Sequence, residues 1–273
     1  MSLAPFARRQ LTVTAVEQLG AYRVLRAADP DGVDPAPGQF AMLAAVERWG
    51  GGEDERPYLP RAFSIARALD GEAHFLLEQL GPGTRRLAEL RPGERLWALG
   101  PLGNGFTMPA SDGRRALLVG GGAGIAPLAI LQDRIEGEAT VLLGFRDREH
   151  ARGAALLDGA RVATDDGSTG HHGQVTELLA AELARDPHAC VYACGPAGML
   201  EAVRAICERG GVPAQLALEA GMACGFGACF GCVVPCRGGG YLRVCVDGPV
   251  IDAVELEHVD AHGRANRVAG APA

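Results

Sequence analysis

The sequence lacks several features of membrane, secreted and nucleic-acid-binding proteins. No apolar run in its 273 residues approaches the roughly 20 that a membrane-spanning helix needs. Residues 1–10 contain no apolar segment followed by a small-residue cleavage site, so we expect no secretion and a cytoplasmic location. The net charge of -7 leaves no basic excess, so we expect no nucleic-acid partner. Internal repeats and low-complexity tracts are also absent from the sequence.

The length and composition are those of a globular protein of more than one domain. Up to residue 108, short apolar stretches alternate with glycine and proline, which predicts an N-terminal antiparallel β-barrel over residues 1–108. The predicted strands are 10–18, 21–27, 39–46, 62–66, 74–79 and 95–98.

The pattern changes after residue 113, where buried-strand runs alternate with helical periodicity. This predicts a parallel α/β domain over residues 109–215. The predicted strands are 115–119, 140–145, 160–164 and 190–193, and the predicted helices are 128–135, 175–183 and 198–209. Residues 216–273 are rich in glycine and cysteine with little periodicity, which indicates a small module stabilised by metal.

Cysteines are concentrated in this last segment. Four of them give the spacing C-x4-C-x2-C-x12-C, close to that of plant-type [2Fe-2S] sites. These candidate ligands are Cys224, Cys229, Cys232 and Cys245. Glycines between them would let the loop wrap closely around sulfide with its amides turned inward. A structural zinc site is the alternative.

Cys236 competes with Cys245 for the fourth ligand position, because it also lies within reach of Cys232. We favour Cys245, which is expected in a strand over residues 241–246. That strand follows the Gly238–Gly240 turn and would fold back on the cysteine loop.

A glycine loop joins the first predicted strand of the α/β domain to its helix. A helix that starts after such a loop directs backbone N–H groups at an anion, so Gly121, Gly122 and Gly124 are candidate dinucleotide-binding residues. The loop departs from the G-x-G-x-x-G pattern at Pro127, and a tight turn without a ligand is the alternative.

A second glycine turn, Gly83-Thr84, precedes a helix predicted over residues 84–90. Arg61, Phe63 and Ser64 lie about twenty residues upstream. Together they would suit a flavin nucleotide, since they supply a charge for pyrophosphate, a ring for stacking and a hydroxyl for a polar edge. Taken singly, Arg61 reads as a surface charge and Phe63 as a core residue.

Together these residues resemble the ferredoxin reductase superfamily and, within it, the electron-transfer subunits of two-subunit, NAD-dependent dihydroorotate dehydrogenases. The similar segments are Pro37-Gly38-Gln39-Phe40, Arg61-Ala62-Phe63-Ser64, Gly83-Thr84, Gly100-Pro101-Leu102-Gly103-Asn104-Gly105-Phe106, the glycine loop, Thr164-Asp165-Asp166-Gly167-Ser168, Cys194-Gly195-Pro196 and the cysteine segment. The chain departs from the common family pattern at Ala62-Phe63 and at His171-His172.

The resemblance implies a flavin-binding barrel, a nicotinamide-binding α/β domain and a C-terminal [2Fe-2S] domain. The residues that would bind FAD are Arg61, Ala62, Phe63, Ser64, Leu76, Leu77, Glu78, Gly83 and Thr84. Cys194, Gly195 and Pro196 are further cofactor-binding candidates. No catalytic acid or base for dihydroorotate is implied in this chain.

The implied function is electron transfer from the FMN of a catalytic subunit through [2Fe-2S] and FAD to NAD+, in pyrimidine (UMP) biosynthesis. The partner would be that subunit, in a heterotetramer of two copies each, docked at the face around residues 224–232. Alternatives are a reductase subunit of a hydrogenase or ferredoxin:NADP reductase complex, and a zinc-stapled interaction protein. The sequence leaves NAD against NADP open, since Arg146 and Arg148 would either meet a 2'-phosphate or be solvated.

Overall fold

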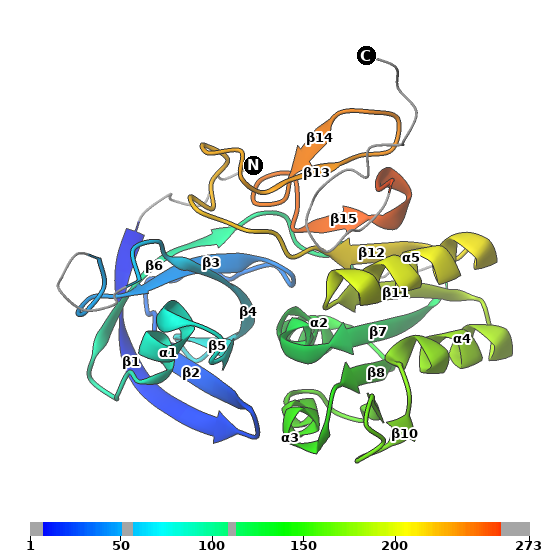
Figure 1. The fold of residues 1–273 in the computed structure, drawn as a ribbon, viewed down its shortest axis with the longest axis horizontal. Helices are drawn as coiled ribbons and strands as arrows, with labels where there is room; N and C mark the ends of the chain where they lie inside the picture. Colours follow the sequence, from blue (N-terminus) through cyan, green and yellow to red (C-terminus); the bar gives the residue numbers. More distant parts are fainter. Residues whose placement is uncertain (1–7, 51–56, 109–112, 258–273) are drawn as a thin grey trace.

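The computed structural model describes residues 8–50, 57–108 and 113–257 of the chain. Figure 1 shows a barrel beside a sheet with covering helices, and a smaller C-terminal segment across the top of both. The predicted fold class, a barrel followed by an α/β domain and a small C-terminal module, is confirmed.

Six strands of the described residues close into an antiparallel barrel in the order β1-β2-β5-β4-β3-β6. They are β1 (Arg8–Leu19), β2 (Tyr22–Ala28), β3 (Phe40–Ala45), β4 (Arg61–Leu69), β5 (Glu72–Glu78) and β6 (Arg95–Leu102), with the short helix α1 (Pro82–Ala88) after β5. In β1, Leu11 and Val13 are buried, and in β6, Leu96 and Ala98 are buried. They alternate with less buried residues, because successive side chains of a strand point to opposite faces. This alternation fills the barrel with aliphatic side chains.

The central sheet runs in the order β10-β9-β8-β7-β11-β12-β15 among the described residues. Its strands are β7 (Arg115–Gly121), β8 (Ala139–Phe145), β9 (Arg161–Thr164), β10 (His171–His172), β11 (Ala189–Cys194), β12 (Ala214–Ala217) and β15 (Val250–Asp252). All neighbours are parallel except β12 and β15, which are antiparallel. The predicted parallel sheet is therefore present, with one antiparallel edge strand from the C-terminal segment.

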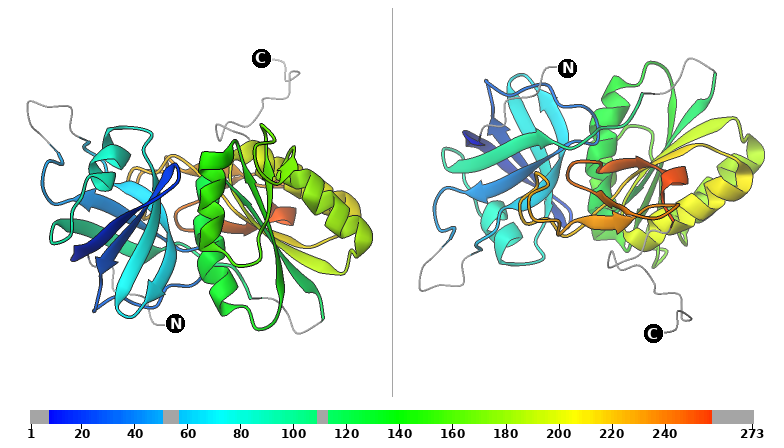
Figure 2. Two further views of the ribbon diagram at one scale, coloured as in Figure 1. Left: turned by 90° about the horizontal axis from the view of Figure 1, so that it is seen from below. Right: turned by 90° about the horizontal axis from the view of Figure 1, so that it is seen from above.

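Helices cover both faces of this sheet, as parallel sheets require. They are α2 (Ala126–Arg134), α3 (Arg148–Ala151), α4 (Val175–Arg185) and α5 (Ala197–Gly210), with the 3-10 turns η1 (Gly122–Ile125), η2 (Arg152–Leu156) and η3 (Ala253–Glu255). Figure 2 (left) shows α2 between the barrel and the sheet. Arg67 of β4 reaches across this junction to Asp133 of α2, with Nε and Oδ2 2.8 Å apart.

The C-terminal module contains a short hairpin of β13 (Val233–Pro235) and β14 (Tyr241–Arg243). The strand predicted over residues 241–246 is too long, because the chain turns after Arg243. The Asp247 carboxylate accepts the Arg243 backbone N–H at 2.7 Å, and the Val246 N–H bonds to the Arg243 carbonyl at 2.9 Å. Cys245 consequently lies in a turn rather than in a strand.

This module packs onto both larger parts of the molecule. Met42 of the barrel, Leu216 of the sheet and Val244 of the module belong to one hydrophobic cluster. Figure 2 (right) shows the orange segment over the junction of barrel and sheet. The sequence-predicted boundary between residues 215 and 216 falls inside β12, and the boundary after residue 108 adjoins residues outside the described ranges.

None of the helices in the described residues combines the length and the apolar character needed to cross a membrane.

Candidate functional site

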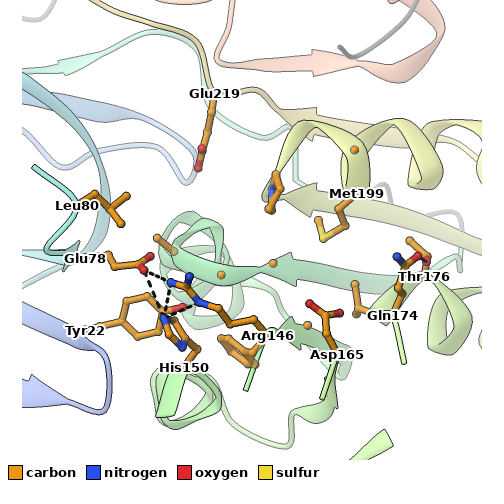
Figure 3. Close-up of a pocket in the computed structure, with 18 residues that line it drawn as sticks. Tyr22, Glu78, Leu80, Arg146, His150, Asp165, Gln174, Thr176, Met199 and Glu219 are labelled. Atoms are coloured by element: carbon orange, nitrogen blue, oxygen red, sulfur yellow. Dashed lines mark hydrogen bonds and ion pairs between the residues drawn. The ribbon is translucent and has the colours of Figure 1, made fainter. Parts of the chain in front are cut away.

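A cavity of about 490 Å³ opens between the barrel and the carboxyl ends of the sheet strands (Figure 3). Tyr22 and Glu78 line it from the barrel. The loops after β7, β8 and β9 supply the opposite wall. Ligands of open α/β sheets bind at this edge, because loops and helix N-termini converge there.

The structure brings two predicted cofactor motifs together at this cavity. A Cβ on Gly124 would lie 2.6 Å from the Gly195 backbone, and one on Gly121 would lie 2.9 Å from Cδ of Pro196. Either side chain would force the two loops apart, so glycine permits their contact. Gly122 has φ +56, a backbone conformation that favours glycine, and lines the cavity. Cys194 itself is buried beneath the wall.

Tyr22 contributes an unsatisfied group to the same cavity. Its hydroxyl is buried and has no hydrogen-bond partner among the described residues. It lies 4.0 Å from the position that a Cβ on Gly122 would take. Burial, with the nearby Glu78 carboxylate, raises the pKa of Tyr22 well above its usual value, so the hydroxyl stays a donor. An orphaned buried donor beside a glycine loop fits a phosphate-bearing ligand.

Glu78 is the centre of a polar cluster that crosses the cavity between barrel and sheet (Figure 3). Its carboxylate forms an ion pair with Arg146 and lies 3.3 Å from Nε2 of His150. Arg146 Nε donates to His150 Nε2 at 2.9 Å, and His150 Nδ1 lies 2.7 Å from Asp147. Arg146 is therefore held at the barrel by these contacts, while 58% of its side chain remains exposed.

The predicted flavin motifs meet on one side of the barrel. A Cβ on Gly83 would lie 2.7 Å from the Arg61 Nε, so the guanidinium packs directly on the backbone at the start of α1. Arg61 also lies over Trp49, with Cζ 5.9 Å from the ring centroid. The Thr84 hydroxyl accepts the N–H of Leu80 at 2.8 Å and so caps α1 rather than facing outward. An arginine held beside an uncluttered turn fits a flavin phosphate.

The other predicted flavin residues lie on adjacent strands. Ala62 is exposed and Phe63 packs partly against the barrel core, while Ser64 pairs in register with Phe40. Leu76 and Leu77 are buried on opposite faces of β5, the first toward the sheet domain and the second inside the barrel.

The four predicted cysteine ligands converge in two pairs. Cys232 donates its thiol to Cys245 Sγ at 3.2 Å, and the backbone N–H of Cys245 points at Cys232 Sγ at 3.5 Å. Cys224 interacts with the Cys229 side chain. The negative charge of Cys224 contributes to the raised pKa of Cys245, which is consistent with proximity of the two pairs. Among the described residues, no three potential ligands are already arranged around a single metal ion.

The surroundings shift the thiol pKa values of the two pairs in opposite directions. Burial opposes ionisation of Cys224, but backbone N–H groups of Phe226 and Cys229 outweigh it and lower its pKa to about 6. Burial and the Cys232 thiol raise the pKa of Cys245 to about 12. Inward-turned amides beside two cysteine pairs fit a two-iron cluster, which takes four thiolates.

Cys236 is separate from these pairs. Its thiol donates to the Gly239 carbonyl at 2.9 Å within the β13–β14 turn, and its backbone forms a bridge with Leu256. This geometry favours Cys245 as the fourth ligand.

The cysteine loop also contacts the barrel next to the predicted flavin motif. Gly225 has φ +81, and a Cβ there would lie 2.5 Å from Cγ of Met42. Met42 in β3 pairs with Ala62 in β4. The loop that holds Cys224 therefore lies one strand away from the Arg61–Ser64 motif.

Several cavity residues were missed by the sequence analysis. Tyr22, His150, Met199 and Glu219 line the cavity but belong to no predicted motif, and Asp165 belongs to the Thr164–Ser168 motif but was given no site role. Glu219 reaches into the cavity from the segment after β12 (Figure 3), and burial of its carboxyl raises its pKa. The signals available for Asp165 were that motif and its position directly after a predicted strand. Tyr22 lies in the barrel, and no sequence signal pointed to it.

Comparisons with known proteins agree with this architecture. A profile of the iron-sulfur cluster binding domain of dihydroorotate dehydrogenase B matches residues 219–257. The chain is 37% identical to the dihydroorotate dehydrogenase B (NAD(+)) electron transfer subunit of Caldanaerobacter subterraneus subsp. tengcongensis, over 82% of this chain and 88% of that protein. It is 40% identical to the subunit of the same name from Bacillus caldolyticus, over 81% and 86%.

Solved structures share the fold at lower identity. A chain from a structure of the NADH-dependent reduced ferredoxin-NADP oxidoreductase, related to flavin-based electron bifurcation, has a TM-score of 0.74 and 23% identity, covering 96% of this chain and 92% of that one. A ferredoxin reductase in carbazole 1,9a-dioxygenase has a TM-score of 0.64 and 24% identity, covering 77% and 67%. With relatives above 35% identity over most of both sequences, the chain belongs to the family of dihydroorotate dehydrogenase B electron transfer subunits.

Proposed function

We propose that this chain is the electron transfer subunit of an NAD-dependent dihydroorotate dehydrogenase and links dihydroorotate oxidation to NAD+ in pyrimidine (UMP) biosynthesis. The observation that carries the proposal is the place of the cysteine loop. It packs against β3 of the barrel at Met42, beside the Arg61–Ser64 motif, and its other side belongs to the module that adjoins the sheet. These contacts support a path in which the cluster would lie next to the flavin, with the nicotinamide site in the adjoining sheet domain.

The proposed spatial sequence of the cofactors, from cluster through FAD to NAD, matches the number of electrons that each can exchange. When bound, NAD exchanges two electrons as hydride, a [2Fe-2S] cluster carries one, and FAD exchanges either one or two. The chain's residues bind and orient these groups. Arg61 and the Gly83 turn would hold the flavin phosphates, and Gly121, Gly122 and Gly124 with Pro196 would form the dinucleotide loops. Cys224, Cys229, Cys232 and Cys245 would ligate the cluster.

We further propose the division of the chain into a flavin domain (1–108), a nicotinamide domain (109–215) and a cluster domain (216–273). Dihydroorotate itself would be oxidised in a separate FMN-containing catalytic subunit, two copies of which join two copies of this chain in the cytoplasm. The face around Cys224–Cys232 is the proposed docking surface. Phe226 and Phe230 are exposed there, and exposed aromatics are typical of interface cores.

A spectrum of the anaerobically purified chain tests the cofactors. Flavin bands with a broad cluster absorbance are expected. A colourless protein that contains one zinc ion would contradict the proposal and favour the zinc-stapled alternative.

Activity tests the division of labour between subunits. The purified chain should reduce a dye with NADH and leave dihydroorotate unchanged. Addition of the catalytic subunit should then give NADH formation that depends on dihydroorotate. Dihydroorotate turnover by this chain alone would refute the assigned roles. Efficient electron transfer from this chain to a hydrogenase or a ferredoxin, without the catalytic subunit, would favour the alternative that it is a reductase subunit of one of those complexes.

A further inference from the structure

The junction between barrel and sheet contains a second cavity, of about 340 Å³, whose lining residues in the described ranges all differ from those of the first. Strands β1, β2, β4 and β5 form its barrel side, and Ala155 and Leu156 of η2 face them. Along β5, His74 lines the second cavity and Glu78 the first, about 13 Å apart in an extended strand. The second cavity is therefore separate from the proposed nucleotide site.

Three basic side chains stand in one row across the barrel side of this cavity. Arg26 of β2 pairs in register with His74 of β5, and His74 pairs in register with Arg67 of β4. Directly opposite residues on one face of a sheet have side chains about 5 Å apart, and like charges so placed repel. All three residues line the cavity. The row therefore favours a negative charge in front of it.

Carboxylates of the chain meet this need only in part. Arg67 is held by Asp133, with Nε and Oδ2 2.8 Å apart, and its Nη2 donates to the Leu156 carbonyl at 2.9 Å. Arg26 donates Nη2 to Glu17 at 3.0 Å, at a rim where 53% of the Glu17 side chain is exposed. The Nε of Arg26 is buried and has no hydrogen-bond partner among the described residues. A buried donor on a charged group is costly to leave unpaired, so an acceptor from solvent or from a ligand is needed there.

The pKa of His74 shows that both guanidiniums act on the interior of the cavity. Burial lowers this pKa, and the positive charges of Arg26 and Arg67 lower it further. The carboxylate of Glu72, whose Oε2 lies 3.3 Å from Nε2 of His74, acts in the opposite direction and is outweighed. The cavity is therefore positive in front of the row.

We propose that this cavity binds a small oxyanion, a phosphate either free or carried by a small molecule, between Arg26 and Arg67. A phosphate oxygen would accept the buried Arg26 N–H, and hydrogen bonds between guanidinium and phosphate are among the stronger ones in proteins. The volume lies within the range of about 300–1,000 Å³ typical of small-molecule sites. Leu19 and Val24 add apolar surface to the wall, which suits the carbon part of a phosphorylated ligand.

Calorimetry on the purified chain tests the proposal, with NAD+ present to occupy the nucleotide cavity and with inorganic phosphate and ribose 5-phosphate as probes. Arg26→Gln should weaken binding at least about tenfold, because it removes both the charge and the buried donor. Glu17→Gln should strengthen binding about threefold or more, because it removes a competing carboxylate. A gain in affinity cannot result from misfolding. Arg23→Gln is the matched control on the same strand, outside the cavity lining, and should leave the affinity within about twofold of wild type.

The two probes distinguish the sources of the anion. Ribose 5-phosphate that binds at least about tenfold more tightly than phosphate would identify a phosphorylated small molecule, and equal affinities would identify the free anion. No saturable binding of either probe up to about 10 mM would overturn the inference and leave water as the acceptor for Arg26. Binding that is the same in wild type, Arg26→Gln and Glu17→Gln would also overturn it. The inference is independent of the proposed function, since this binding needs no electron transfer.

Discussion

At the residue scale, the two candidates for the fourth cluster ligand differ in what surrounds them. Cys245 is buried against Cys232, whereas Cys236 is bonded to a carbonyl in a hairpin turn. We expect Cys245→Ser to lose the visible cluster absorbance and its iron, and Cys236→Ser to retain both. Iron and acid-labile sulfide per protein, with the absorbance spectrum, measure this. The reverse pattern would make Cys236 the ligand.

Gly225 permits a second test at the same scale. Alanine there combines an unfavourable positive φ with a Cβ placed against Met42. Gly238 has φ +87 and no atom within 4 Å of its Cβ position, so Gly238→Ala measures the backbone cost alone. We expect both to destabilise the protein by about 1 kcal/mol through the backbone, and Gly225→Ala by about 1–3 kcal/mol more through overpacking. Chemical unfolding measures both, and equal losses would remove the argument for a tight loop–barrel contact.

At the element scale, Glu182 joins helix α4 to two strands. Its side chain is 6% exposed and pairs with Arg115 of β7, Arg161 of β9 and Arg185, whose Nη2 lies 2.6 Å from Oε2. Burial alone would raise the pKa of Glu182, but the hydrogen bond from Arg161 and the charges of Arg185 and Arg161 outweigh it and lower the pKa.

The pH dependence follows from this lowered pKa. A carboxyl with a depressed folded pKa stabilises the fold above its unfolded pKa, about 4.3, and loses that contribution as the pH falls through the folded pKa. We expect Glu182→Gln to be less stable than wild type by about 2 kcal/mol at pH 7, below the cost of breaking a fully buried pair because the arginines are partly solvated. The difference should close at acid pH.

Unfolding by urea at several pH values measures this difference. Glu177→Gln on the same helix is the control, because within the described ranges Glu177 forms an ion pair with the exposed His171 alone, and glutamine keeps an acceptor for the Gln174 N–H. If the difference in unfolding free energy between wild type and Glu182→Gln does not change with pH, packing rather than charge holds α4 on the sheet.

The elements themselves were largely predictable, and the exceptions have physical reasons. Six barrel strands follow from alternation, because each has one face in the core. Strand β15 was not predicted, since its three residues become a strand only by pairing with β12. The glycine and cysteine motifs were predictable because their chemistry is local in sequence. The contacts of Arg146 with Glu78 were not, because they join residues 68 positions apart.

At the scale of the whole molecule, the proposed flavin and nucleotide sites belong to the barrel and the sheet, and the proposed cluster site belongs to the C-terminal module. We therefore expect the double variant Cys224→Ser, Cys229→Ser to lose the cluster and retain FAD. These two cysteines lie outside the buried core, unlike Cys232 and Cys245.

This variant should still reduce a two-electron acceptor with NADH but should pass no electrons to the catalytic subunit. Flavin absorbance per protein and the two activities measure the outcome. Dihydroorotate-dependent NADH formation without the cluster would remove the cluster from the electron path. Wild-type protein with the catalytic subunit is the control.

The antiparallel pairing of β15 with β12 has a mechanical consequence. The chain leaves the sheet after β12, passes over the barrel as the cysteine loop, and returns to the sheet as β15. With the Arg67–Asp133 pair at α2, this strap ties the barrel to the sheet at two separated places. Hinge rotation between the two would strain both ties at once. We therefore expect the barrel and the sheet to keep their relative orientation when nucleotide exchanges, so that the spacing between the proposed redox sites changes little during turnover.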